Sequence, residues 1–336
     1  MGGFILRRSL LAIPVVIGAI SILFVLFFMI PGDPVTLISG GGGAREVNEQ
    51  TRANIEAKYG LDDPWFVQYK DYWGRTLSGD LGVSYKSNQS VNDIVKQTVA
   101  ASGRLAFWAI LIEVFIGIGA GILSAVRRYS FLDGLTTIST AAVSAIPVFV
   151  LGYLLQRVFG VIPAKNGWPE WATFPVQGIG PDTWVLGVIP TGDQWKYLVL
   201  PAITLASVST AIVARLTRTT MLEVTRADYM RTALAKGLRE RSVIFRHGLR
   251  NAMIPVVTLI GIDFATLFGS AILTETVFNW PGMGSELASA LGSRDVPIVL
   301  GLTLVIVLIY VFINLLVDLS YAWFDPRIRS TIAEDS

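Results

Sequence analysis

Two acidic residues, Glu113 and Asp263, are the ionisable groups that lie well inside long apolar segments of this sequence. A charge at the centre of a bilayer costs about 2.5–3.5 kcal/mol on insertion scales, so such a side chain normally faces a bundle interior or water. Both carboxyl groups could line a polar path for a substrate, or each could be buried and hydrogen-bonded to a neighbouring helix. The aliphatic neighbours of Glu113 favour burial for that residue, and the role of Asp263 stays open.

The sequence motifs of common enzyme classes are missing from this chain. It contains neither a G-x-x-x-x-G-K-[ST] phosphate loop nor a G-x-S-x-G nucleophile elbow. With no cysteine and one histidine, His247, it offers no disulfide framework, iron–sulfur centre or Cys/His zinc site. A carboxylate-only site for a hard cation stays open. We therefore expect no catalytic residue, no bound cofactor and no metal in this chain.

The composition is that of a membrane protein. Of the 336 residues, 52% are hydrophobic and only 15% are charged, whereas a soluble domain carries about 25% charged residues. The first apolar run, 10–30, follows Arg7 and Arg8. It is longer than the apolar part of a signal peptide, which has roughly 7–15 residues. We interpret it as an uncleaved first span.

Six apolar stretches are long enough, or nearly so, to cross a bilayer core, which needs about 20 helical residues. They are 10–30, 105–126, 135–155, 200–214 with a polar extension, 254–273 and 298–319. The fourth is short and rich in Ser and Thr, which suits a helix packed against other helices. The motif GIGAG at 117–121 also predicts a close helix–helix contact. The expected fold class is an all-α integral membrane protein with six transmembrane helices.

The basic residues predict the orientation of the spans. With the N-terminus inside, the cytoplasmic loops and tails collect 15 of the 27 Lys and Arg residues in short segments, as the positive-inside rule requires. Both termini are then cytoplasmic. We expect four parts: a tail and first span at 1–30, an extracytoplasmic subdomain at 31–104, a core at 105–320 with a cytoplasmic loop at 217–252, and a cytoplasmic tail at 321–336.

The expected extracytoplasmic subdomain begins with a flexible GGGGA linker at 40–44. Val47, Thr51, Ile55 and Tyr59 then follow at intervals of four, which predicts an amphipathic helix that ends at Gly60. The next segment is dense in Trp and Tyr, which favour membrane interfaces. Two roles remain open: a cap without chemistry, or a docking surface for another protein.

The most unusual stretch is DYMRTALAKGLRERSVIFRHGLRNAMIP, residues 228–255. A helix is predicted to start at Asp228, whose side chain can cap it, and Gly237 lets the chain leave helical geometry. Anionic lipid headgroups would explain the cations alone. The apolar knob formed by 243–245 favours insertion into a protein groove instead. Protein docking is the preferred interpretation, a membrane-surface anchor is the second, and nucleic acid is not an expected partner.

The basic loop resembles the cytoplasmic signature of binding-protein-dependent ABC importer permeases, E-A-A-x3-G-x9-I-x-L-P. Aligned on Gly237, it matches the signature at Ala233, Gly237 and Leu249. The E, A, I and P positions hold Arg231, Thr232, His247 and Arg250. Forms such as RTALAKGL and RHGLRNAMIPV are usual in one branch, the peptide/nickel permeases.

Other segments resemble the same branch over nearly the whole chain. They are LRRSLLAIPVVIG, PGDPV, YGLDDPW, SGDLGVSY, ETVFNWPGMG and VDLSYAWFDPRIR. The first-loop segments are similar to those of the B-type subunit of dipeptide and oligopeptide permeases. The resemblance implies the type I ABC importer permease fold and a bacterial inner-membrane location.

The resemblance also implies partners and a mechanism. A homologous C-type permease would complete the channel, two cytoplasmic ATPases would bind ATP and Mg, and an extracytoplasmic binding protein would deliver di- or oligopeptides. Residues 238–245 would form a coupling helix in an ATPase groove. The residues implied in coupling are Arg231, Thr232, Ala233, Gly237, Leu238, Arg239, Glu240, Arg241, Val243, Ile244, Phe245, His247, Leu249 and Arg250. The alternative is an ion-gradient-driven secondary transporter or channel.

Overall fold

The computed structural model describes residues 2–28, 35, 49–50, 53, 56, 62–181 and 183–324. Its α-helices are α1 (Gly2–Phe28), α4 (Trp65–Leu77), α5 (Val91–Ile112), α6 (Ile118–Val126), α7 (Phe131–Ala145), α8 (Val148–Gln156), α9 (Ile162–Lys165), α10 (Gln194–Thr225), α11 (Asp228–Ala235), α12 (Glu240–Ser242), α13 (Leu249–Phe278), α14 (Met283–Ser293) and α15 (Val296–Phe324). Three segments are π-helical: η1 (Glu113–Gly117), η2 (Arg157–Val161) and η4 (Val243–Gly248). A 3₁₀ turn, η3 (Glu170–Ala172), and a hairpin of β1 (Trp184–Val185) and β2 (Ile189–Pro190) precede α10.

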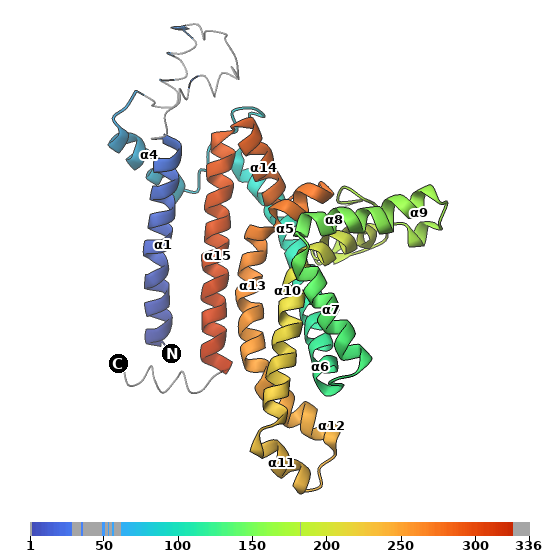
Figure 1. Ribbon diagram of the computed structural model, residues 1–336. Helices are drawn as coiled ribbons and strands as arrows, with labels where there is room; N and C mark the ends of the chain where they lie inside the picture. Colours follow the sequence, from blue (N-terminus) through green and yellow to red (C-terminus); the bar gives the residue numbers. More distant parts are fainter. Residues whose placement is uncertain are drawn as a thin grey trace.

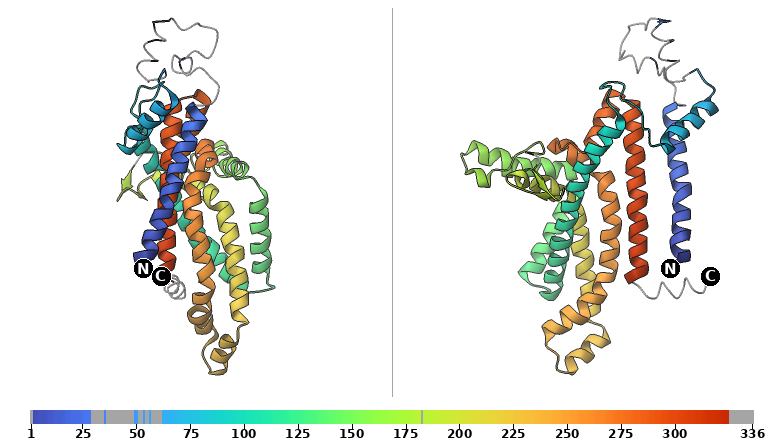
Figure 2. Two further views of the ribbon diagram at one scale, coloured as in Figure 1. Left: turned by 90° about the vertical axis from the view of Figure 1, so that its left-hand side faces the viewer. Right: turned by 180° about the vertical axis from the view of Figure 1, so that it is seen from behind.

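The long helices lie side by side in one bundle (Figures 1 and 2). Helix α10 is central, because it contacts α5, η1, α6, α7, α8 and α13. Helix α1 lies at the edge, where it packs along α15 and touches α4. In the described part of the chain, five helices are long and apolar enough to cross a membrane: 91–126, 148–165, 194–225, 243–278 and 296–317. The described apolar part of α1, Ser9–Val25, is shorter.

The predicted third span, 135–155, is wrong as a single helix. Helix α7 ends at Ala145, and Ile146 and Pro147 have extended ψ angles of 128° and 137° before α8 begins. The cause is local: proline disfavours helical geometry in the residue before it, and it has no N–H for the helix ladder. As a result α8 and α9 leave the bundle sideways as an arm (Figure 1).

The predicted fourth span, by contrast, is the middle of a longer helix, since α10 has 32 residues. Glycines allow its close packing against the second apolar run. A Cβ atom added to Gly121 would lie 2.5 Å from Thr217 Cβ, and one added to Gly117 would lie 2.9 Å from Val213 Cγ1. The contact predicted from GIGAG is therefore confirmed, and α10 is its partner.

A buried ion pair fastens α10 to the start of α7. Asp133 lies in the first turn of α7, and its carboxylate accepts two hydrogen bonds from Arg218 of α10, at 2.8 and 3.1 Å. Ser124 Oγ donates to the same carboxylate at 2.5 Å, and the Tyr129 N–H donates at 2.9 Å. The hydrogen bonds from Arg218 and Ser124 hold the pKa of the Asp133 carboxyl well below its usual range.

Replacing Asp133 with Asn should lower the melting temperature of the detergent-solubilised protein near neutral pH, because Arg218 then loses its counter-charge in a largely buried site. The folded-state pKa lies below the unfolded value of about 3.9. The stabilisation is therefore complete at neutral pH and is lost as the pH falls below about 4.

The difference in melting temperature between wild type and Asp133→Asn should thus shrink in acid. Asp93→Asn is the matched control, because Asp93 forms an exposed pair with Lys96 at 3.6 Å and such pairs contribute little. A difference that is the same at every pH would contradict the role given to the ionised carboxylate.

A second buried carboxylate, Glu275, joins three helices at the opposite end of the bundle. Its Oε1 accepts a hydrogen bond from Ser102 of α5 at 2.6 Å. Its Oε2 accepts the N–H groups of Gly284 and Ser285, in the first turn of α14, at 2.7 and 3.0 Å. The positive end of the α14 dipole favours this negative charge. A Cβ atom added to Gly282 would lie 2.2 Å from Oε1, so the glycine leaves room for the carboxylate.

Glu275→Gln should lower the free energy of unfolding by about 2–3 kcal/mol, because an amide –NH₂ group replaces one of the two oxygens that accept the three hydrogen bonds. Thermal unfolding in detergent measures the change. Glu286→Gln, on the partly exposed side of α14, is the control and should change the melting temperature little. Equal decreases in melting temperature for the two variants would show that the hydrogen bonds of Glu275 do not stabilise the protein.

Candidate functional site

The basic loop forms a compact hairpin at one end of the bundle. Helix α11 leaves α10 through Arg226 and Ala227 and ends at Ala235. Gly237 then adopts a φ of +78°, a left-handed conformation that glycine tolerates without strain. After α12 the chain runs through η4 directly into α13, so 243–278 is one unbroken helical run. The predicted departure from helical geometry at Gly237 is confirmed.

Two local expectations about this loop are wrong. The N-cap of α11 is Ala227, and Asp228 lies inside the first turn without capping it. The expected coupling helix at 238–245 is not a separate element either, because it begins at Glu240 and does not end at Phe245. Since η4 continues into α13, the loop is attached rigidly to a long helix on one side and through Gly237 on the other.

The hairpin is held together by apolar side chains that face inward. Met230 of α11 is 3% exposed, and its Cε would lie 3.1 Å from a Cβ atom added to Gly248. Ile244 and Leu249 pack on a buried cluster that includes Met221 of α10. The Asn251 side chain donates a hydrogen bond of 3.0 Å to the Tyr229 hydroxyl of α11. These contacts give the loop a defined shape without any partner.

The predicted apolar knob at 243–245 is therefore only partly correct. Val243 is 1% exposed and Ile244 packs inward, whereas Phe245 is 50% exposed. The helical period explains the difference, because consecutive residues on a helix point in different directions. Leu238 is also exposed, as is Leu234 at the end of α11, so the outer apolar surface of this loop includes Leu234, Leu238 and Phe245.

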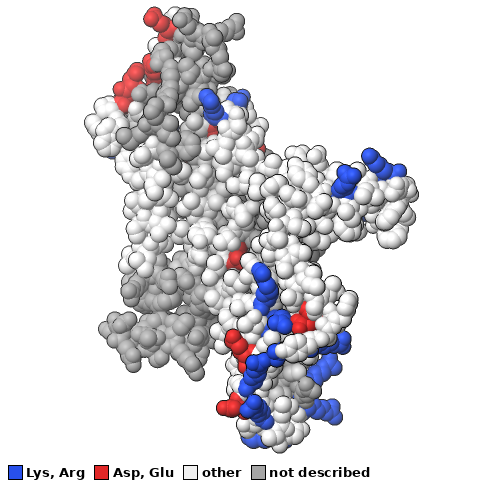
Figure 3. Space-filling view, in the orientation of Figure 1, with Lys and Arg blue, Asp and Glu red and all other residues white. Residues whose placement is uncertain are grey.

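Cations surround this apolar surface. Figure 3 shows Lys and Arg side chains gathered at the end of the molecule that carries α11 and α12, below a band that is almost free of charge. Among the described residues, no ion pair within 4.0 Å involves a cation of this loop. The exposed basic side chains are Arg231, Lys236, Arg239, Arg241, Arg246, His247 and Arg250.

One shallow hollow lies on this surface. Arg239, Arg241, Ser242 and Phe245 line it. It therefore combines an aromatic ring with two guanidinium groups, a pairing typical of the residues that dominate protein interfaces. The other predicted coupling residues lie around it: Thr232 is exposed on α11, Ala233 is partly buried there, and Glu240 begins α12.

The predicted path residues lie together within the bundle. Glu113 begins η1 and is fully buried, while Asp263, on α13, is partly exposed. Their carboxyl groups interact with each other. The structure thus brings two residues from separate spans into one site, which the sequence could not establish.

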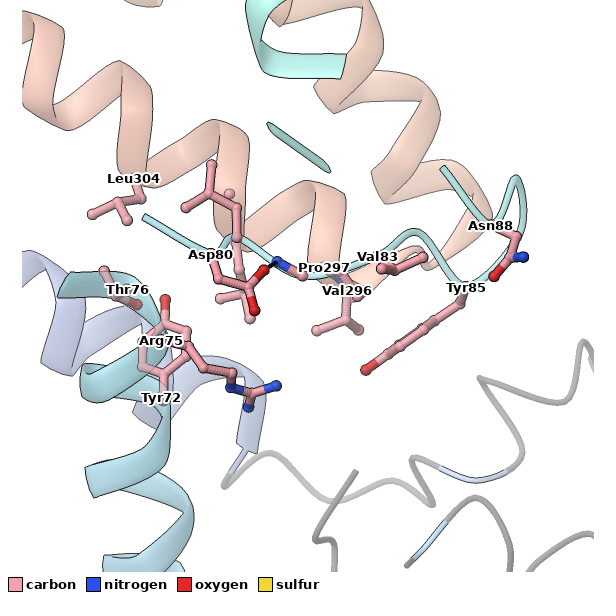
Figure 4. Close-up of a pocket in the computed structure, with 14 residues that line it drawn as sticks. Tyr72, Arg75, Thr76, Asp80, Val83, Tyr85, Asn88, Val296, Pro297 and Leu304 are labelled. Carbon is pink, nitrogen blue, oxygen red and sulfur yellow. Dashed lines mark hydrogen bonds between the residues drawn. The ribbon is translucent and has the colours of Figure 1, made fainter. Parts of the chain in front are cut away.

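A third feature lies at the end opposite the basic loop. Figure 4 shows a cavity between α4, the following loop and the start of α15, with a volume of about 280 Å³. Asp295 shapes its loop wall, because its carboxylate accepts a hydrogen bond of 2.5 Å from Ser84. Polar groups on the cavity wall include Arg75, Thr76, Asp80, Tyr85 and Asn88.

The predicted helix at 47–59 lies almost entirely outside the described residues.

Sequence reasoning missed two buried carboxylates that join helices, Asp133 and Glu275. Asp133 precedes the third apolar stretch and Glu275 follows the fifth, so neither counted as a charge inside a span. The segment ETVFNWPGMG that starts at Glu275 carried a usable signal. An acidic residue shortly before a turn and a new helix can satisfy the N–H groups of that helix.

Two family models match nearly the whole chain. Residues 117–330 match the family model described as "Binding-protein-dependent transport system inner membrane component". Residues 1–106 match the model "Binding-prot-dependent transport system membrane comp, N-term". The two matches lie on either side of a short gap that includes Glu113.

Full-length relatives agree with the family models. The chain is 38% identical to the dipeptide transport system permease protein DppB of Alkalihalophilus pseudofirmus, over 98% of this chain and 100% of the relative. It is 39% identical to the protein of the same name from Escherichia coli K12, over 97% and 98%. It is 34% identical to the oligopeptide transport system permease protein AppB of Bacillus subtilis, over 98% and 100%. The chain therefore belongs to the family of inner-membrane permease components of binding-protein-dependent ABC importers, as its resemblance indicated.

Proposed function

We propose that this chain forms half of the translocation path of an ATP-driven importer of di- or oligopeptides. The observation that carries the proposal is full-length identity of 38–39% to two permeases named for dipeptide transport. A relative named for oligopeptide transport is also similar over the full length, so the length of the peptide is not assigned. The chain has no ATP site of its own in this proposal.

In the assembled importer, a homologous C-type permease completes the path, two cytoplasmic ATPases bind ATP and Mg, and an extracytoplasmic protein delivers cargo. Six transmembrane spans are proposed, with α1 as the first and with α7, which runs along the bundle, in the third. The cavity between α4 and α15 (Figure 4) is the proposed contact surface of the delivery protein. Its mixed polar and apolar lining supports this role.

The proposed topology has both termini in the cytoplasm of a bacterial cell. The start of α1 and the end of α15 lie toward the end of the bundle that carries the basic loop (Figures 1 and 2). Density of Lys and Arg marks the cytoplasmic side, and this loop has the densest cluster. The 31–104 segment is then extracytoplasmic.

Coupling in this proposal runs from the ATPase to α13. Phe245 and Leu238 enter the ATPase groove, and the surrounding cations select its surface charge. Because η4 and α13 are continuous, a displacement of the docked loop moves α13 directly. Nucleotide binding drives the change only through different affinities of the ATPases for the two states.

The energy source separates this function from its alternative, an ion-gradient-driven transporter or channel. Peptide uptake by cells that carry the complete system should continue when the proton gradient is collapsed and stop when ATP is depleted. Uptake that follows the ion gradient at constant ATP would refute the proposal.

Three variants with different expected results test the coupling surface. Phe245→Asp places a charge on an exposed ring and should leave the protein folded but abolish peptide-stimulated ATP hydrolysis and transport. Phe245→Leu keeps an apolar side chain and should retain both. Val243→Asp buries an unpaired charge and should prevent accumulation of the protein altogether. Normal transport by Phe245→Asp would remove Phe245 from the interface.

The left-handed backbone conformation of Gly237, between α11 and α12, is tested in the same assay. Proline cannot adopt a φ of +78°, and it would also lose the hydrogen bond from the Gly237 N–H to Leu234 O, 2.9 Å long. Gly237→Pro should therefore uncouple ATP hydrolysis from transport. Gly187→Pro is the matched control, because Gly187 has a φ of +75° in the hairpin between β1 and β2. Uncoupling by the control as well would show that backbone strain anywhere has this effect.

A further inference from the structure

The carboxyl groups of Glu113 and Asp263, here called the acidic pair, lie near the middle of the membrane-spanning helices. Asp263 is near the centre of the helical run 243–278, and Glu113 is near the centre of the run 91–126. Ser209, close to the midpoint of α10, lies next to the Asp263 carboxyl. Three helical segments, η1, α10 and α13, therefore contribute to one polar site.

The acidic pair has too few hydrogen-bond donors for two buried carboxylates: Ser209 lies at the Asp263 carboxyl, and no donor reaches Glu113. Both Oε atoms of Glu113 and the Oδ2 atom of Asp263 are buried without a donor. No ion pair involves either residue in the described part of the chain. The Glu113 carboxyl interacts with the Asp263 carboxyl, which has no hydrogen to donate while both are ionised.

Two other buried carboxylates in this chain do have hydrogen-bond donors. Glu275 accepts three hydrogen bonds, and Asp133 has a guanidinium and two further donors. Each of those two groups is satisfied by the protein itself. The acidic pair is the exception, because no cation of the described chain neutralises it and the Glu113 oxygens have no donor.

The geometry of the acidic pair also provides an entrance. Glu113 is 0% exposed and forms the back of the site, whereas Asp263 is partly exposed on α13. Ile262 and Thr266 on either side of Asp263 are exposed as well. A cation that reaches this side of α13 would contact Asp263 first and would lie in front of the buried charge.

We propose that Glu113 and Asp263 bind a primary ammonium group, with Asp263 as the direct contact and Glu113 as the buried counter-charge. An –NH₃⁺ group has three N–H donors and one positive charge, which matches the unsatisfied acceptors of the acidic pair. The assignment of this group to the cargo rests on the proposed function, because a peptide with a free amino terminus carries one. Without an ammonium group, one proton shared by the two carboxyls supplies the missing donor.

An apolar carbodiimide, which modifies protonated carboxyl groups in apolar surroundings, tests the site on the assembled complex in detergent. Dicyclohexylcarbodiimide should label Asp263 or Glu113, as mapped by peptide mass spectrometry. Methylammonium and alanyl-alanine should each reduce the labelling about tenfold at roughly ten times their dissociation constants. N-acetyl-alanyl-alanine and sodium chloride at the same ionic strength should not protect.

The chain offers its own controls. Glu275 is buried but fully hydrogen-bonded, so it should stay unlabelled in the same sample. Asp263→Asn and Glu113→Gln remove one carboxyl each with nearly unchanged shape. Each should abolish protection by methylammonium at the remaining carboxyl, and its melting temperature confirms that it is folded.

Several results would overturn the ammonium site: no labelling of either residue, no protection by methylammonium, or equal protection by sodium chloride or the acetylated peptide. The outcome is independent of the proposed function. If methylammonium protects but the complex imports no peptide, the site stands and the cargo is wrong. If the complex imports peptides but nothing protects, the permease function stands and the site is wrong.

Discussion

The close contact between α10 and the glycines of the second apolar run determines how the rest of the bundle is arranged. Gly117 and Gly121 let α10 approach until the side chains of Val213 and Thr217 touch the neighbouring backbone. Within lipid there is no hydrophobic force between helices, so packing of this kind and buried polar bonds hold the bundle together. Once α10 is central, every other long helix except those at the α1–α15 edge packs against it.

Polar bonds then secure this arrangement at both ends. Near the basic loop, Arg218 of α10 pairs with Asp133 at the start of α7. At the far end, Glu275 of α13 bonds to Ser102 of α5 and to the first turn of α14. Between these two places lies Glu113, at the beginning of the π-helical segment that ends at Gly117. A π-helical turn within an α-helix is frequent at functional sites, which agrees with the site proposed there.

Much of this fold could be predicted from apolar stretches, and the errors have physical causes. Length and hydropathy alone located 105–126, 254–273 and 298–319 inside observed helices. They could not show that Pro147 divides 135–155, because hydropathy does not register the missing N–H. Residue type identified the basic loop and Gly237. It could not separate Val243 from Phe245, because both are apolar and only the packing of α11 on η4 decides which one is exposed.

For Glu113 and Asp263, the sequence identified each residue but could not predict that the two carboxyl groups lie together. Each residue was identified as an unusual charge within a span, but the residues are 150 positions apart. Their contact depends on how α5 and α13 lie beside α10. Asp133 and Glu275 were missed because they stand just outside the apolar stretches, where a charge looks ordinary. Buried partners, rather than position in the sequence, make them important.

The unbroken run from η4 through α13 has a consequence for how events in the proposed cycle are linked. At one end it carries Phe245, the proposed ATPase contact, and at the other it carries Glu275, which holds α14 on the far side of the bundle. Asp263 lies between them. This helical run of about 50 Å links the two faces, and Pro255 inside α13 is the place where it can bend. In the proposed cycle, engagement of the ATPase, rearrangement at the outer face and any change at Asp263 are therefore coupled through one helix.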